Sequence, residues 1–191
     1  MQTNLVNRVS RILDSLAKAG FLAAVALVLL AGGLAAQQPD NRAATQREAM
    51  QKLKFLAGHW SGPVTIVRGP GEPLRLTQTE QVEYKLEGLV LVVEGKSTGA
   101  DGKAQFEALA TIAYDDAAQA YHIRAYNDGH YVDAPLTVEA DGFSWGFEAG
   151  PAHIVNAMHL TAKGEWQEAT DVTFGANPPH RSVEMVLTRQ P

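Results

Sequence analysis

The chain has no cysteine among its 191 residues, and it has no excess of basic residues. Without cysteine there are neither disulfides nor thiolate metal ligands, so a stable domain must rely on packing and hydrogen bonds. Sixteen lysines and arginines against 21 aspartates and glutamates give a formal net charge of −5. An acidic chain with scattered basic residues lacks the electrostatic footprint of a nucleic-acid-binding protein, and it does not favour binding to an anionic membrane.

Long apolar runs are also scarce, and the main one lies near the N-terminus. A basic segment precedes an apolar core, Phe21 to Ala31, which ends in small residues. This core is shorter than the roughly twenty residues of a spanning helix, and its layout is typical of a secretory signal peptide. We predict a signal peptide over residues 1–36, with cleavage after Ala35 or Ala36; an uncleaved membrane anchor is the alternative. A periplasmic or secreted protein, free of the membrane after cleavage, is expected.

The rest of the chain divides into a polar linker, residues 37–44, and one domain, residues 45–191. The segment TQREAMQKLKFL at the start of this domain is predicted to form a short helix. Thr45 and Glu48 have the spacing of a capping box, and Met50 and Leu53 recur at a helical interval.

From Trp60 onward the hydrophobic period changes to two, and turn signals recur along the chain. Asp-Gly and Asn-Asp-Gly sequences, as at 101–102 and 127–129, are strong hairpin signals because glycine adopts positive φ without strain. The turns separate about ten short strand-like segments, with no obvious helix among them. An all-β fold follows, and we predict a single antiparallel up-and-down barrel of about ten strands, because closure removes the sheet edges. A β-sandwich is the alternative.

The short helix followed by Gly58, His59 and Trp60 resembles the calycin pattern shared by lipocalins and fatty-acid-binding proteins. More closely, LKFLAGHWSG, the segment GKAQFEALATIAYDDAAQAYHIRAYNDG and the terminal MVLTR resemble a bacterial lipocalin-like domain of unknown function. The resemblance implies that Trp60 plugs the closed end of the barrel and that a basic residue of the last strand, Arg189, lies across its ring. Such a contact is physically reasonable as a cation–π interaction.

An inward Trp60 would fix the faces of the first two strands. Alternation then places Gln78, Glu80 and Tyr84 inside, among apolar neighbours. The two polar side chains would orient a ligand's polar group or, alternatively, contact ordered water in the interior.

The densest run of polar and aromatic residues is YHIRAYNDGHY, residues 121–131. Burial statistics favour Tyr121 and Ile123 as its core side. On the alternative register Arg124 and Tyr126 face inward, where arginine would pair with a carboxylate. Trp145 and His159 complete the set of candidate lining residues.

Other chemistries find little support in the residue pattern. The six histidines have no metal-ligand spacing, so no metal site is predicted. The chain also lacks a Gly-x-Ser-x-Gly elbow, so no catalytic residue is assigned. The leading hypothesis is a non-enzymatic barrel without a cofactor that binds a small apolar or amphipathic molecule. The alternatives are a haem-binding, nitrobindin-like barrel with redox or nitrogen-oxide chemistry, and a ligand-free interaction module of the cell envelope.

Overall fold

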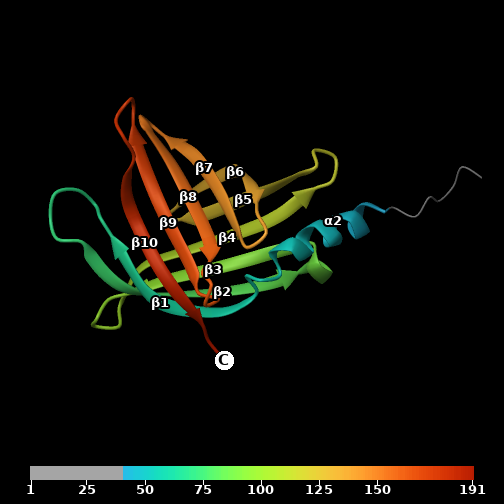
Figure 1. Ribbon diagram of the computed structural model, residues 1–191, viewed down its shortest axis with the longest axis horizontal. Helices are drawn as coiled ribbons and strands as arrows, with labels where there is room; N and C mark the ends of the chain where they lie inside the picture. The colour runs from blue at the N-terminus through green and yellow to red at the C-terminus, as the bar shows by residue number, and fades with distance from the viewer. Residues whose placement is uncertain (1–40) are drawn as a thin grey trace, which may run out of the picture. The chain divides into compact units, whose positions relative to one another are not determined.

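The computed structural model describes residues 41–191, and these form a closed antiparallel β-barrel preceded by one short helix (Figure 1). The signal peptide and most of the linker predicted from the sequence lie outside the described residues. No helix in this part of the chain is both long enough and apolar enough to cross a membrane.

The helix α2 spans Arg42–Met50 and continues as a 3₁₀ turn, η1, over Gln51–Leu53. It begins three residues before Thr45, so the predicted capping box is wrong. Asn41, a residue type favoured at helix N-caps, immediately precedes the helix. Met50 and Leu53 are completely buried, as their helical spacing predicted.

Ten strands follow, in the number and architecture that the turn pattern predicted. They are β1 (Gly58–Ile66), β2 (Leu74–Lys85), β3 (Val90–Thr98), β4 (Ala104–Asp115), β5 (Ala120–Asn127), β6 (His130–Val138), β7 (Gly142–Ala149), β8 (Ala152–Leu160), β9 (Trp166–Phe174) and β10 (His180–Arg189). Each strand pairs with the next, and β1 pairs with β10 to close the barrel. The sandwich alternative is therefore excluded.

The two ends of the barrel differ, and the strand register shows which strands begin and finish at each. Strand β1 begins, and strand β10 finishes, at the end next to η1, which we call the closed end. Helix α2 is fastened there by the Tyr84 and Tyr121 hydroxyls, which donate hydrogen bonds of 2.6 and 2.7 Å to the carbonyl oxygens of Met50 and Ala49. The opposite end, where the β1–β2, β3–β4 and β9–β10 connections lie, is the open end.

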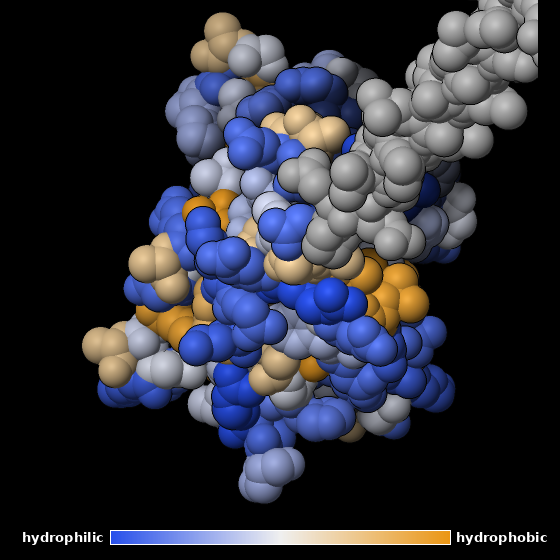
Figure 2. All heavy atoms as spheres, turned by 90° about the vertical axis from the view of Figure 1, so that its right-hand side faces the viewer, coloured by the Kyte–Doolittle hydropathy of each residue, from blue (hydrophilic) through white to orange (hydrophobic). Residues whose placement is uncertain are grey.

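Hydrophilic side chains predominate on the face shown in Figure 2, where hydrophobic side chains form only small patches.

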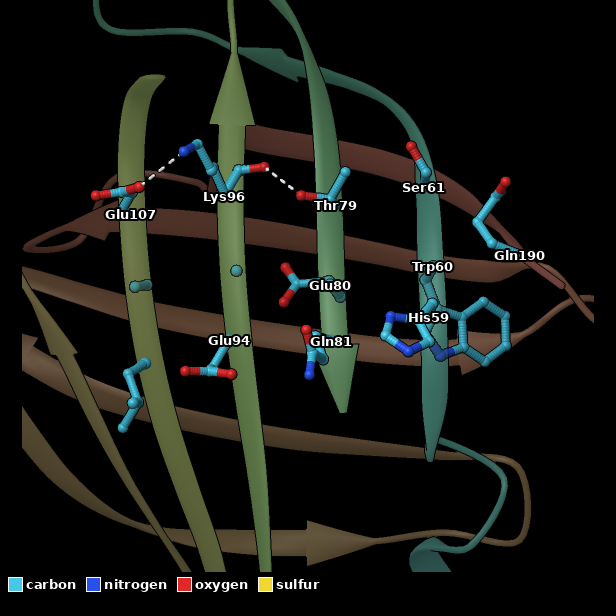
Figure 3. Close-up of a pocket in the computed structure, with 13 residues that line it drawn as sticks. His59, Trp60, Ser61, Thr79, Glu80, Gln81, Glu94, Lys96, Glu107 and Gln190 are labelled. Carbon is cyan, nitrogen blue, oxygen red and sulfur yellow. Dashed lines mark hydrogen bonds and ion pairs between the residues drawn. The ribbon is translucent and has the colours of Figure 1, made fainter. Parts of the chain in front are cut away.

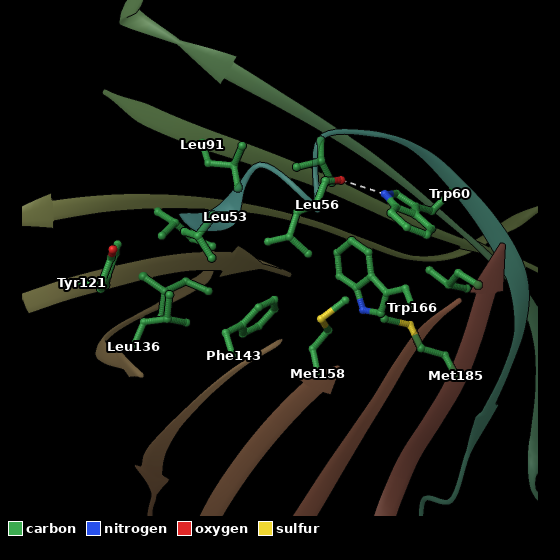
Figure 4. Close-up of a cluster of buried hydrophobic side chains, with 14 of the residues drawn as sticks. Leu53, Leu56, Trp60, Leu91, Tyr121, Leu136, Phe143, Met158, Trp166 and Met185 are labelled. Atoms are coloured by element: carbon green, nitrogen blue, oxygen red, sulfur yellow. Dashed lines mark hydrogen bonds between the residues drawn. The ribbon is translucent and has the colours of Figure 1, made fainter. Parts of the chain in front are cut away.

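The hydrophobic core is concentrated at the closed end (Figure 4). Leu53 and Leu56 project from the segment after α2 into the space between the strands, and both are completely buried. Trp60 meets Trp166 edge to face at a centroid distance of 5.6 Å, and Trp166 meets Phe143 in the same way at 6.4 Å. Burying large apolar and aromatic side chains supplies the main stabilisation here, since the fold has no disulfide.

Candidate functional site in the barrel interior

Trp60 on β1 and Arg189 on β10 are direct partners in the sheet and pack together at the closed end. Trp60 is almost fully buried, and its Nε1 donates a 2.8 Å hydrogen bond to the carbonyl oxygen of Leu56. The guanidinium carbon of Arg189 lies 4.1 Å from the centre of the Trp60 ring, so the expected cation–π contact is present. Arg189 also donates hydrogen bonds to the carbonyl oxygens of Ala57 and, at 2.6 Å, Phe55.

Gly58 makes this arrangement possible in two ways. Its φ is +130°, a conformation that residues with a Cβ rarely adopt. A Cβ built on it would also lie 2.5 Å from Nη1 of Arg189. The glycine of the Gly-x-Trp motif therefore serves the closed end, and these residues are structural.

Two patches of polar side chains lie on the inner face of the barrel, further from the closed end than most of the core. The first patch is on β2 and β3. Ser97 donates its hydroxyl hydrogen to Oε1 of Gln78, and Nε2 of Gln78 donates a 2.7 Å hydrogen bond to Oε1 of Glu80. All three residues are buried. Sequence alternation predicted the inward positions of Gln78 and Glu80 but did not identify Ser97.

The second patch is on β8 and β9, and the sequence analysis missed it. Thr170 donates a 2.7 Å hydrogen bond to Oδ1 of Asn156, its direct partner in the sheet. Glu168 accepts a 2.8 Å hydrogen bond from Nε1 of Trp166. A parity argument from Trp166 would have placed Glu168 and Thr170 on the same face.

The two glutamates, one in each patch, have strongly perturbed acidities. Burial and, to a smaller extent, the Glu168 carboxylate raise the pKa of Glu80 to about 8, and the hydrogen bond from Gln78 opposes this change. Burial also raises the pKa of Glu168 to about 7, against the effect of the Trp166 hydrogen bond. The two carboxyl groups are thus close enough to interact, and near neutral pH the pair retains a proton.

One atom of this interior lacks a partner. Oε2 of Glu80 is the single buried side-chain nitrogen or oxygen in residues 41–191 without a hydrogen bond. The whole Glu80 residue is only 8% exposed. A buried carboxyl oxygen without a partner is costly, so it marks a position where a ligand group or water would be stabilised.

Above the polar patches, the open end of the barrel is lined by apolar side chains. Deeper in the barrel, Ala110 and Ala125 are direct partners on the inner face of β4 and β5, and Ala110 lies in the ladder that also contains Val82. At the mouth, Leu74, Phe106 and Phe174 occupy inward positions in the register yet are 37%, 36% and 46% exposed. The two polar patches therefore lie deeper in the barrel than its apolar mouth.

The remaining candidate lining residues divide between the two faces of the sheet. Tyr84 and Trp145 lie inward and pack against the core, and Trp145 stacks on Phe147 at 5.6 Å. Arg124, Tyr126 and His159 lie on the outer face, so the expectation that they line the interior is wrong.

The physical reason for the outward set is visible in strand β5. Tyr121 and Ile123 are buried, so alternation forces the residues between and beyond them outward. Arg124 forms an exposed ion pair with Asp133 on β6, with Nε to Oδ1 at 2.8 Å. Tyr126 lines a shallow outer pocket with Tyr131, 6.1 Å away between ring centres.

A second outer pocket, of about 440 Å³, crosses strands β1 to β4 (Figure 3). Most of its lining side chains come from outward positions, as Figure 3 shows for Glu94, Lys96 and Glu107. Lys96 is already paired with Glu107 at 3.1 Å, and Thr79 donates to the Lys96 carbonyl at 3.2 Å. Because these polar groups satisfy one another, the pocket is a weaker candidate site than the interior.

All six histidines are exposed, so the described residues place no imidazole among the buried side chains. His180, at the open end, is in inner-face register: it pairs with Val172 and its ring stacks on Phe174 at 5.8 Å. Within residues 41–191 no group of three or more histidine, aspartate or glutamate side chains is arranged to hold a metal ion.

Comparison with known proteins agrees with the barrel at the level of the fold. The ten-strand antiparallel barrel fits a calycin-like fold. The chain is similar to the crystal structure of Rv2717c from M. tuberculosis, with a TM-score of 0.57 over 75% of this chain and 98% of that one. Sequence identity is 14%, so the likeness concerns the fold alone. No family model and no curated protein matches the sequence.

Proposed function

We propose that this chain is an exported, lipocalin-like binding protein that holds a small apolar or amphipathic molecule inside its barrel without acting on it chemically. The observation that carries the proposal is the partnerless Oε2 of Glu80, buried on the inner face below an apolar mouth. Export is supported by the N-terminal sequence pattern, with the periplasm or the exterior as the destination.

The interior has the composition of a small-molecule site. Such sites are mostly apolar, with a few polar groups that orient the ligand. Here the apolar part is supplied by side chains such as Phe147 and Val172, and the polar part by the two patches that contain Glu80 and Glu168. Neither the ligand-free envelope module nor the haem-binding barrel has a comparable observation in its favour.

Binding of the neutral fluorescent dye Nile red to the purified full chain tests the proposal. Ala125→Trp places a bulky ring on the inner face of β5, and it should weaken dye binding at least tenfold. Ala157→Trp adds the same ring at an exposed position of β8 and should leave binding unchanged. Circular dichroism verifies that both variants are folded. Equal binding by the two variants would show that the dye does not occupy the interior.

Native mass spectrometry of the protein purified from its own cell envelope provides an independent readout. A retained small molecule, lost from the Ala125→Trp variant and kept by Ala157→Trp, is the expected result. A bare mass for the wild-type protein, together with absence of dye binding, would contradict the proposal.

A further inference from the structure

The position of the Glu80 carboxyl group is tightly defined. Its Oε1 accepts the hydrogen bond from Gln78, which leaves Oε2 free. Gly95 on β3 is the direct partner of Glu80, and a Cβ built on Gly95 would lie 2.8 Å from both carboxyl oxygens. The Glu80 carboxyl group thus packs against the backbone of Gly95. Any residue with a Cβ at position 95 would occupy part of the same space.

The charge around this carboxyl is of one sign. Trp60 and Gly95 flank Glu80 on the neighbouring strands and carry no charge, while Glu168 is the second carboxyl that interacts with it. Towards the closed end the titratable groups are the phenols of Tyr84, Tyr114 and Tyr121. The hydroxyls of Tyr84 and Tyr121 bind α2.

No basic side chain in residues 41–191 neutralises the two carboxyl groups. Every described lysine and histidine is exposed, and so is every described arginine except Arg47. Arg47 is paired with Glu87 at the closed end, with its Nη2 3.1 Å from Oε2 of Glu87. Arg189 packs on the Trp60 ring, and the backbone carbonyl oxygens of Ala57 and Phe55 accept its hydrogen bonds. Two interior carboxyls without a cation would be matched by a cation brought by the ligand.

Aromatic rings lie beside these carboxyls. The Glu168 carboxylate binds the Trp166 indole directly, and Trp145 and Phe147 form a stacked pair on β7. Carboxylates together with aromatic faces are suited to organic ammonium groups, which combine charge, hydrogen-bond donors and affinity for π systems.

We propose, building on the function proposed above, that the barrel selects an amphipathic organic amine and holds its ammonium group between Glu80 and Glu168. The ammonium N–H donates to the free Oε2 of Glu80, and the apolar part of the ligand extends towards Leu74, Phe106 and Phe174 at the mouth. Anionic amphiphiles such as fatty acids are disfavoured, because their charge would face an interior acidic pair that has no cation of its own.

Three probes with the same apolar chain test this selectivity: octylamine, 1-octanol and octanoate. Each is titrated against the full chain at pH 7.5, by calorimetry and by displacement of Nile red. Octylamine is protonated at this pH, as lysine is. It should bind at least tenfold more tightly than octanol, and octanoate should bind most weakly.

Isosteric variants locate the selectivity. Glu80→Gln and Glu168→Gln should each reduce the ratio of octylamine affinity to octanol affinity at least tenfold. Both variants remove a buried acid, so they are expected to fold. Glu94→Gln, at an exposed position of the adjacent strand β3, is the matched control and should bind like the wild-type protein.

Proton release supplies a readout that a purely structural role would not change. Octylammonium binding favours the ionised carboxyls, so titrations in buffers of different ionisation enthalpy should show protons leaving the protein, and fewer leaving Glu80→Gln. Equal affinity for octylamine and octanol would overturn the amine proposal and leave the carrier function standing. A preference that survives in both glutamine variants would also overturn it. Failure of all three probes to displace bound Nile red would overturn the amine proposal, whereas absence of Nile red binding would contradict the carrier function itself.

Discussion

The Arg189 guanidinium lies over the Trp60 ring, 4.1 Å from its centre. It also donates hydrogen bonds to backbone carbonyl oxygens of the segment before β1. One side chain therefore joins the last strand to the first strand and to the segment after α2.

Trp60→Ala should lower the free energy of unfolding by about 3–5 kcal/mol, since it removes a fully buried side chain. Arg189→Ala should cost about 1–2 kcal/mol through the lost contact and hydrogen bonds. Urea denaturation measures both. Ligand affinity in the folded fraction should stay the same, and its loss at unchanged stability would assign Trp60 to the binding site.

The two interior carboxyl groups predict that the free protein becomes less stable as the pH rises. Both pKa values are raised on folding, so the native state holds protons that the unfolded chain releases above pH 4.5. The stabilisation is therefore complete below that pH and is lost as the pH passes through about 7 to 8. We expect a decrease of roughly 2–4 kcal/mol between these limits. Glu80→Gln should flatten this dependence, and Glu94→Gln should not; denaturation midpoints between pH 4.5 and 8.5 make the comparison.

Gly62 and Gly95 both lie close to other atoms, but of different kinds. A Cβ on Gly62 would lie 2.1 Å from the Val186 carbonyl oxygen, which belongs to the backbone and cannot move without shifting β10. Gly62→Ala should therefore cost more than about 2 kcal/mol. Gly95→Ala meets only the movable side-chain ends of Glu80 and Gln78, so it should cost less than about 1 kcal/mol and instead displace the carboxyl group. Similar losses in both would contradict this distinction, and a reduced amine preference in Gly95→Ala would support the proposed site.

The β2–β3 turn contains two residues in the left-handed region, Leu86 with φ of 51° and Glu87 with φ of 55°. Leu86 is 69% exposed, so its side chain contributes little burial to offset this conformation. Leu86→Gly should raise the free energy of unfolding by up to about 1 kcal/mol. Lys85→Gly, one residue earlier in extended backbone, should lower it by a similar amount. Thermal denaturation of the two variants provides the test, and destabilisation by Leu86→Gly would contradict it.

The sequence was informative where a strand alternates clearly between apolar and polar residues. In β1 and β2 the inward Trp60 determined the faces, and so Gln78 and Glu80 were predicted inside. In β9 the segment WQEATDVTF carries polar residues on both faces, so hydrophobic alternation gave no direction and Glu168 was missed. Asn156 was missed because it is polar among apolar inward neighbours. Arg124, Tyr126 and His159 were candidates for their chemistry, but burial of the alternate residues placed them outside.

The pairing of β1 with β10 also determines when the domain can be completed. Trp60 and Arg189 are partners in this ladder, so the contact that closes the barrel joins residues from nearly opposite ends of the domain. Contacts so distant in sequence slow folding, because the loop entropy must be overcome before the contact stabilises anything. Until the final strand has been synthesised, β1 has an unpaired edge and Trp60 has no arginine to cover it. Folding of the barrel is therefore expected to follow completion of the chain.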